Sequence, residues 1–253
     1  MLAVGVGLAA AWVFWGISLT PSAPERPVFL LVGANVATCA TASLLCTVAS
    51  QGWRRALFLF ALCVAVSFGM EGIGTATGVP YGEYSYTELI GPKLPGSVPH
   101  IIPVAWFMMM APALAIGRWL CSVRWQQALV AAGLMLLWDV ALDPAATGDF
   151  PLWRWHGGSG FYGIPTQNWI GWFGTAFTIA GCYVWVVPSW RAGGGRMSAL
   201  IYVVQGALAA TAAVASGRWW AAVVWGAGMA LFALLAYRSV RRAKDRSAVF
   251  AAR

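Results

Sequence analysis

Eight long apolar stretches, separated by polar or Pro- and Gly-rich segments, dominate the pattern of hydrophobic and polar positions along the chain. Each is close to the ~20 residues that an α-helix needs to cross a bilayer. They cover about residues 2–20, 28–49, 55–77, 101–118, 125–142, 169–187, 198–216 and 219–237. No segment between them has the pattern of a β-strand, so no strand is expected. The pattern therefore predicts an all-α integral membrane protein, folded as one bundle of about eight transmembrane helices.

The composition excludes a soluble domain. Of the 253 residues, 60% are hydrophobic and only 9% are charged, far from the usage of soluble proteins. The stretch at 2–20 has the length of a secretory signal peptide, but no Lys or Arg precedes it. Trp12, Phe14 and Trp15 also stand where a cleavage site would need small residues. We therefore expect this stretch to be a helix of the bundle.

Basic residues indicate the orientation of the bundle. If the helices alternate in direction, twelve of the sixteen Lys and Arg residues fall on one side of the membrane. The other side receives Arg26, Lys93, Arg154 and Arg218. The positive-inside rule then places both termini in the cytoplasm, with a transmembrane domain at 1–237 and a basic cytoplasmic tail at 238–253 that anionic lipids attract. Because the basic residues form no groove-sized patch, no nucleic-acid partner is expected.

Two long loops, at 78–100 and 143–168, lie on the extracytoplasmic side in this topology. Both are rich in Gly, Pro and aromatic residues, and loops of this length are uncommon unless they are functional or disordered. Their density of Tyr and Trp argues against disorder. Trp153 and Trp155 have a second interpretation, because amphipathic rings also settle at the membrane interface without belonging to any site.

Three carboxylates, Glu71, Asp139 and Asp143, lie within or at the ends of the apolar stretches. An ionisable group in hydrocarbon costs about 2.5–3.5 kcal/mol on insertion scales, so it needs a partner, water or a chemical role. Counted from the preceding arginines, Glu71 and Asp139 both lie about 22–24 Å from the cytoplasmic boundary. Asp139 and Asp143 are four residues apart and share one helix face. We therefore expect one carboxylate cluster beneath the two aromatic loops.

A purely structural interpretation of these acids stays open. In this interpretation, Glu71 pairs with Asn35, a tyrosine or a backbone donor, and the pair serves only to fix helix packing. Asp143 would then be an interfacial cap. Pro144 is expected to keep Asp143 from continuing in the helical conformation. If all three acids cluster in a poorly solvated site, they cannot all ionise, so at least one should carry a proton at neutral pH. A neutral acid beside an ionised one suits general acid–base chemistry on an apolar substrate.

Several chemistries lack the residues that they need. The two histidines, His100 and His156, lie in loops, so the sequence holds no bis-His haem pair and no histidine cluster for a di-iron oxygenase. Lys93 and Lys244 are the two lysines and neither lies in a helix centre, which excludes a retinal Schiff base. No nucleotide-binding fingerprint follows a strand. We therefore expect no metal and no cofactor.

Residues 68–173 carry two ordered sets of acids, prolines and aromatic residues. The first is Glu71-Gly72-(x)5-Gly78-Val79-Pro80-Tyr81-Gly82-Glu83-Tyr84-x-Tyr86, followed by Gly91-Pro92 and Ile102-Pro103-x-Ala105-Trp106-Phe107-Met108-Met109. The second is Trp138-Asp139-(x)3-Asp143-Pro144, then Trp153-x-Trp155 and Tyr162-Gly163-Ile164-Pro165-x-x-Asn168-Trp169-x-Gly171-Trp172. In order and in residue type, both sets resemble the CruF-type carotenoid biosynthesis proteins, which are carotenoid 1,2-hydratases.

The resemblance implies addition of water across the terminal C1–C2 double bond of an acyclic carotenoid, which gives a tertiary alcohol. Protonation of this alkene creates a tertiary carbocation, which needs a desolvated proton donor and nearby π faces. Glu71, Asp139 and Asp143 are the expected catalytic residues. The expected substrate-binding residues are Tyr81, Glu83, Tyr84, Trp106, Tyr162, Asn168, Trp169 and Trp172. The polyene would enter from the lipid, and water through the loops.

These expectations describe a multi-pass protein of a prokaryotic cell membrane. Its partners would be the bilayer, a long acyclic carotenoid, water and other membrane enzymes of carotenoid biosynthesis. Two other functions stay open. A membrane terpene or carotenoid cyclase would share the protonation step and quench the cation within the molecule. A small proton-coupled transporter would use the same acids as a relay.

Overall fold

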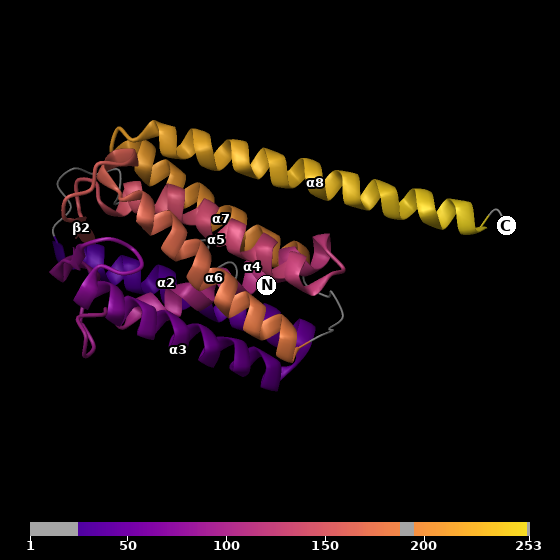
Figure 1. The fold of residues 1–253 in the computed structure, drawn as a ribbon, viewed down its shortest axis with the longest axis horizontal. Helices are drawn as coiled ribbons and strands as arrows, with labels where there is room; N and C mark the ends of the chain where they lie inside the picture. Colours follow the sequence, from indigo (N-terminus) through magenta and orange to yellow (C-terminus); the bar gives the residue numbers. More distant parts are fainter. Residues whose placement is uncertain (1–24, 188–194, 252–253) are drawn as a thin grey trace.

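The computed structural model describes residues 25–187 and 195–251. Within these ranges the chain forms a bundle of seven α-helices (Figure 1). The helices are α2 (Glu25–Gln51), α3 (Trp53–Thr77), α4 (Ile101–Leu120), α5 (Arg124–Ala146), α6 (Thr166–Val186), α7 (Gly195–Ala215) and α8 (Trp219–Ala251). Two short 3-10 helices, η1 (Glu88–Ile90) and η2 (Phe161–Gly163), lie in the long loops.

The bundle is that of a multi-pass membrane protein. Within the described ranges, six helices, α2 to α7, are long and apolar enough to cross a bilayer, and α8 adds a shorter apolar segment at Trp219–Leu235. The expected all-α membrane protein is thus confirmed. The expected helix at 2–20 lies outside the described residues, so the total of eight stays a prediction. α8 runs past the end of the bundle (Figure 1) and remains helical across the predicted boundary at residue 238.

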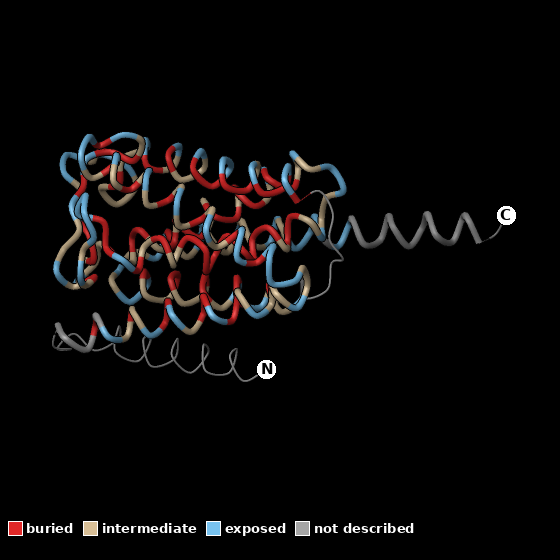
Figure 2. Tube along the Cα trace, turned by 90° about the horizontal axis from the view of Figure 1, so that it is seen from below, coloured by how far each residue is buried: buried red, intermediate tan, exposed pale blue. Residues whose placement is uncertain are grey.

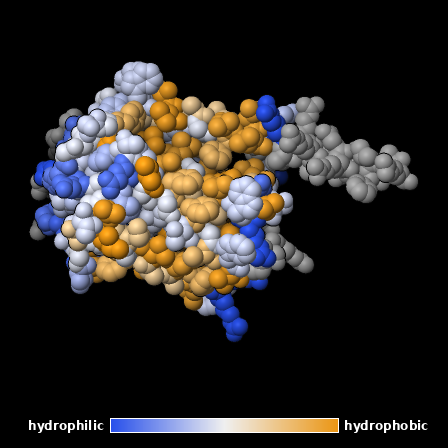
Figure 3. Space-filling model, in the orientation of Figure 1, coloured by the Kyte–Doolittle hydropathy of each residue, from blue (hydrophilic) through white to orange (hydrophobic). Residues whose placement is uncertain are grey.

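The exterior of the bundle is apolar. Large hydrophobic side chains such as Ile73, Ile170, Phe177 and Leu231 are exposed on different helices. Figure 3 shows hydrophobic surface along the sides of the bundle and hydrophilic surface at its ends. This distribution suits helices whose sides face lipid and whose ends face water.

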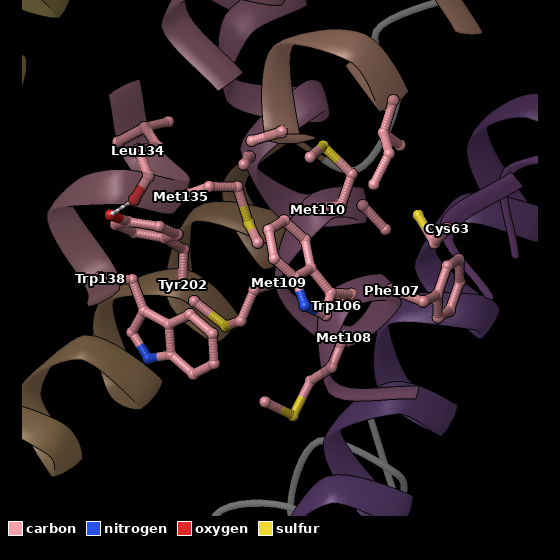
Figure 4. Close-up of a cluster of buried hydrophobic side chains, with 14 of the residues drawn as sticks. Cys63, Trp106, Phe107, Met108, Met109, Met110, Leu134, Met135, Trp138 and Tyr202 are labelled. Carbon is pink, nitrogen blue, oxygen red and sulfur yellow. Dashed lines mark hydrogen bonds between the residues drawn. The ribbon is translucent and has the colours of Figure 1, made fainter. Parts of the chain in front are cut away.

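α4 is the central helix. Residues 106–110 are consecutive, yet each is at most 1% exposed, so α4 is enclosed on all sides. Its side chains pack with Leu134, Met135 and Trp138 of α5 and with Tyr202 of α7 (Figure 4). The Tyr202 hydroxyl donates to the Leu134 carbonyl at 2.6 Å. Figure 2 shows this buried interior beneath a partly exposed outer surface.

A two-stranded antiparallel sheet joins the two long loops. β1 (Tyr84–Tyr86) pairs with β2 (Trp153–Trp155), with Tyr84 opposite Trp155 and Tyr86 opposite Trp153. The expectation of no strand was therefore wrong. Each strand is three residues long and its partner is distant in sequence, so neither gives a periodic signal of its own. The sheet holds aromatic residues of both loops over one end of the bundle.

The end of α5 also differs from expectation. Asp143 is helical, because α5 continues through Pro144 to Ala146. The backbone N–H and the hydroxyl of Thr147 donate to the Asp143 carbonyl at 3.0 and 2.8 Å. Arg218 adds bonds to the carbonyls of Pro144 at 2.5 Å and Thr147 at 2.9 Å. These donors satisfy the terminal carbonyls and stabilise a final turn that proline alone would disfavour.

The predicted orientation can be tested directly. Arg54, Arg55, Arg118 and Arg124 lie at helix ends opposite the sheet, so the positive-inside rule predicts an extracytoplasmic sheet. A tag within the loop at 78–100 should be labelled from outside intact cells, and a reporter after Arg253 should behave as cytoplasmic. Outside labelling of a tag placed in the turn between α4 and α5 would reverse the predicted orientation.

Candidate functional site

Two of the three predicted acids face one cavity at the end of the bundle that carries the sheet. Glu71 comes from α3 and Asp143 from α5, and the cavity holds about 450 Å³ of empty space, including its opening. Its other lining residues are Tyr81, Tyr84, Tyr86, Ile102, Ala105, Trp106, Trp138, Leu142, Trp153, Trp155, Asn168 and Trp172. The site is therefore a mainly aromatic chamber with a carboxyl group from each of two helices.

Glu71 is 3% exposed and accepts three hydrogen bonds. The hydroxyls of Tyr84 and Tyr86 donate to its Oε2 at 2.6 and 2.7 Å. The indole Nε1 of Trp106 donates to its Oε1 at 3.3 Å. β1 places both tyrosines because residues two apart in a strand lie on the same face. A carboxylate accepts all three bonds without rearrangement. Of the partners suggested for Glu71, tyrosines are used and Asn35 is not, since Asn35 bonds Gln205 instead.

Asp139 and Asp143 are joined by the side-chain amide of Asn168. Asn168 Nδ2 donates to Asp139 Oδ2 at 3.0 Å and to Asp143 Oδ2 at 2.5 Å. The indole Nε1 of Trp153 donates to Asp143 Oδ1 at 2.7 Å. Asp143 is 1% exposed and lines the chamber, whereas Asp139 is fully buried and does not. Asp143 is therefore part of a buried acid pair, which differs from the interfacial cap considered above.

Stacked rings form one wall of the chamber. The rings of Trp106 and Trp172 are stacked with centroids 4.2 Å apart and planes 18° apart. Trp138 meets Trp172 edge to face at 6.0 Å. Tyr81 is 2% exposed, and its hydroxyl bonds Thr175 of α6 at 3.0 Å. Indole faces stabilise nearby positive charge, so the wall suits a substrate that becomes cationic.

The tyrosines beside Glu71 remain hydrogen-bond donors at neutral pH. Burial, followed by the Glu71 charge, raises the pKa of Tyr84 and of Tyr86 above the usual range of phenols. Neither hydroxyl therefore ionises under physiological conditions. Each hydroxyl keeps its hydrogen atom and donates a hydrogen bond to Glu71.

No group of three or more His, Cys, Asp or Glu side chains that could hold a metal ion occurs in the ranges 25–187 and 195–251. The oxygens of Glu71 and Asp143 instead accept bonds from N–H and O–H donors. Asp139 Oδ1 and Asn168 Oδ1 have no hydrogen-bond partner within those ranges. Both are buried oxygens whose capacity to accept a hydrogen bond is not used by the described residues.

Comparison with known proteins assigns the family. The family model described as "Carotenoid biosynthesis protein" matches residues 26–234. The chain belongs to this family. A protein named bisanhydrobacterioruberin hydratase, from Haloarcula japonica, is 36% identical over 124 residues, which cover 47% of this chain and 41% of that relative. The CruF-type resemblance of the sequence is thus confirmed. No solved structure gives a significant match.

In this carotenoid biosynthesis protein, three of the expected substrate-binding residues lie away from the chamber. Glu83 is exposed on the loop between α3 and β1, and the Tyr162 hydroxyl accepts a bond from the Trp220 backbone at 3.2 Å. Trp169 is half-buried on α6 and does not line the chamber. The other five, Tyr81, Tyr84, Trp106, Asn168 and Trp172, line it.

Two hydrogen-bond donors in the site were not among the expected residues. Tyr86 bonds Glu71, and Trp153 bonds Asp143 and is 7% exposed. The interfacial interpretation of Trp153 was therefore wrong. Both residues lie in the motifs of the family, two positions from another aromatic residue. That spacing of two was the available signal, because it puts both rings on one face of an extended segment.

Proposed function

We propose that this protein is a cofactor-independent carotenoid hydratase, a hydro-lyase that adds water across the terminal C1–C2 double bond of an acyclic carotenoid. The observation that carries the proposal is the chamber in which Glu71 and Asp143 face a wall of stacked indole rings. Membership of a carotenoid biosynthesis family and a relative named as a hydratase support it. The proposed location is the plasma membrane of a prokaryotic cell, where the polyene is dissolved.

Asp143 is the proposed proton donor. It lines the chamber, and its carboxyl group shares the amide of Asn168 with Asp139. Two buried acids that share one amide donor in a poorly solvated site do not both ionise readily. The pair therefore retains a proton. The π electrons of the substrate take this proton at C2, which forms a C–H bond and leaves a tertiary cation at C1.

The cation is next captured by water. The Trp106–Trp172 stack stabilises the positive charge while it exists. Glu71 is the proposed base, because its three hydrogen bonds suit a carboxylate. Water forms a C–O bond at C1 and gives one proton to Glu71. Return of that proton to the Asp139–Asp143 pair through solvent restores the site, so the net reaction consumes one water.

Isotope labelling under nitrogen tests the proposed reaction. Membranes containing this protein and an acyclic carotenoid, with chelator and without added cofactor, should form the tertiary alcohol. In ¹⁸O-labelled water the product should gain about 20 mass units, because a proton and one heavy hydroxyl are added. A requirement for dioxygen, with label from that gas, would contradict the proposal and indicate an oxygenase.

Two further outcomes would also overturn the hydratase proposal. A product of unchanged mass would indicate a cyclase, because intramolecular quenching of the cation adds no atoms. Flux of a solute across vesicles that depends on a proton gradient, without any change to the carotenoid, would indicate a transporter.

A further inference from the structure

A second, larger cavity adjoins the acid chamber. It lies between α2, α4, α5 and α7 and holds about 1180 Å³ of empty space, including its opening. Most of its lining is aliphatic or aromatic. It shares five lining residues with the acid chamber, Ile102, Ala105, Trp138, Leu142 and Trp153. A linear apolar molecule with one end in the acid chamber therefore has an adjoining space for the rest of its chain.

A pair of amide side chains interrupts this apolar lining. Asn35 of α2 and Gln205 of α7 both line the cavity, and they are 8% and 3% exposed. Asn35 Nδ2 donates to Gln205 Oε1 at 3.2 Å, and Gln205 Nε2 donates to Asn35 Oδ1 at 3.1 Å and to Cys39 Sγ at 2.9 Å. One N–H of Asn35 and one lone pair of Gln205 Oε1 remain for another group.

The amide pair lies deep along the bundle, away from the helix ends that carry the sheet. Asp149 and Ser216, also in the lining, follow the ends of α5 and α7. Gln205 lies ten residues before the end of α7, or about 15 Å deeper at 1.5 Å per residue. Glu71 lies only six residues before the end of α3, or about 9 Å. The amide pair is therefore about one helical turn deeper in the bundle than Glu71.

We propose that the large cavity binds the isoprenoid chain behind the reacting end group, and that Asn35 and Gln205 recognise a hydroxyl which that chain already carries. The inference rests on the proposed function of the acid chamber and adds to it a preference for oxygenated substrates. A hydroxyl both donates and accepts, so it uses the remaining N–H of Asn35 and lone pair of Gln205 together. A hydrocarbon chain leaves both unpaired, which costs free energy in an apolar cavity.

Binding without turnover is the direct test. In the Glu71→Gln background, the absorption of a polyene is titrated with purified protein, using two acyclic polyenes of equal length. One carries a hydroxyl near the reacting end, and the other carries hydrogen there. We expect the hydroxylated polyene to bind about 10-fold more tightly, which corresponds to about 1.4 kcal/mol. The double variant Asn35→Leu/Gln205→Met removes both amides together, and should abolish this difference by weakening binding of the hydroxylated polyene alone.

A control and a second variant separate recognition from packing. Thr41→Val, on an exposed face of α2 where the hydroxyl bonds only the Ala37 carbonyl of its own helix, should leave the preference unchanged. Ala212→Leu adds bulk to the cavity on α7, seven residues from Gln205, and leaves both amide side chains in the sequence; it should weaken binding of both polyenes about 10-fold. If the double variant does not fold, Ala212→Leu still tests whether the polyene chain occupies the cavity.

The possible outcomes distinguish this inference from the proposed function. Equal affinity of the two polyenes for the protein with native amides, or equal weakening of both by the double variant, would overturn recognition by Asn35 and Gln205 and leave hydration untouched. Unchanged binding in Ala212→Leu would show that the chain does not occupy this cavity. Failure of both polyenes to bind at all would overturn the proposed function itself.

Discussion

Turnover is expected to fall at least about 100-fold when Asp143 is replaced by Asn, which is the scale of a lost general acid. The change keeps the size of the side chain, and the amide oxygen can still accept the bond from Trp153 Nε1. It removes the acidic group that Asp143 presents to the chamber, and with it the proposed proton donor. Initial rates in membranes, with the tertiary alcohol separated and identified by mass, measure the loss.

Two companion variants make this result specific. Asp139→Asn should have a smaller effect than Asp143→Asn, because Asp139 does not line the chamber and, in the proposed mechanism, contributes only through the Asn168 amide that it shares with Asp143. Glu88→Gln should be silent, because Glu88 is exposed and forms an ion pair with Lys93 at 2.6 Å, away from the chamber. Near-normal turnover in Asp143→Asn would eliminate this residue as the proton donor.

Replacement of Glu71 by Gln is expected to have an effect of similar size, at least about 100-fold, for a different reason. The amide is too weak a base to accept a proton from the attacking water. The two tyrosine hydroxyls can reverse and accept from the new N–H₂ group, and Trp106 can still donate to the amide oxygen. The fold should therefore tolerate the change, which purification yield and thermal unfolding of the variant would measure.

Tyr86→Phe tests how much one hydrogen-bond donor contributes to the proposed role of the Glu71 carboxylate. This change removes one of the three donors to Glu71 and leaves the carboxylate in place. Turnover should fall by about 10-fold, the cost of about one hydrogen bond to a charged group. If Tyr86→Phe proved more damaging than Glu71→Gln, the phenol itself would be the reacting group and Glu71 would not be the base.

The apolar stretches and the counting of helical rise predicted much of this structure. Six of the eight predicted helices are long and apolar enough to span a membrane and lie close to their predicted positions. The counting of helical rise also placed Glu71 and Asp139 at one depth, which is consistent with the acids lying at the same end of the bundle. Both results follow from local physics, because a bilayer fixes helix length and a helix fixes rise per residue.

The hydrogen-bond partners of the acids could not be predicted, because they depend on contacts between helices that no local sequence pattern contains. Which of two neighbouring aspartates faces the chamber is set by the rotation of α5 against α4 and α6, and the spacing of four residues does not fix that rotation. Trp153 was ambiguous because an interfacial ring and a buried indole donor have the same sequence signature. The role of Asn168, whose amide donates to both aspartates, could not be predicted because it depends on how α6 packs against α5.

The sheet between β1 and β2 also constrains how the protein becomes active during biosynthesis. Three residue pairs form it, and a sheet this small has little stability in water on its own. Its strands can pair only after α5 has entered the membrane, and Asn168 arrives later still, with α6. A nascent chain that ends before α6 would thus hold Glu71 and Asp143 without the amide that positions the acid pair. The loops and helices from α3 to α6 must therefore assemble as one unit, and the proposed acid pair would be complete only after α6 has been inserted.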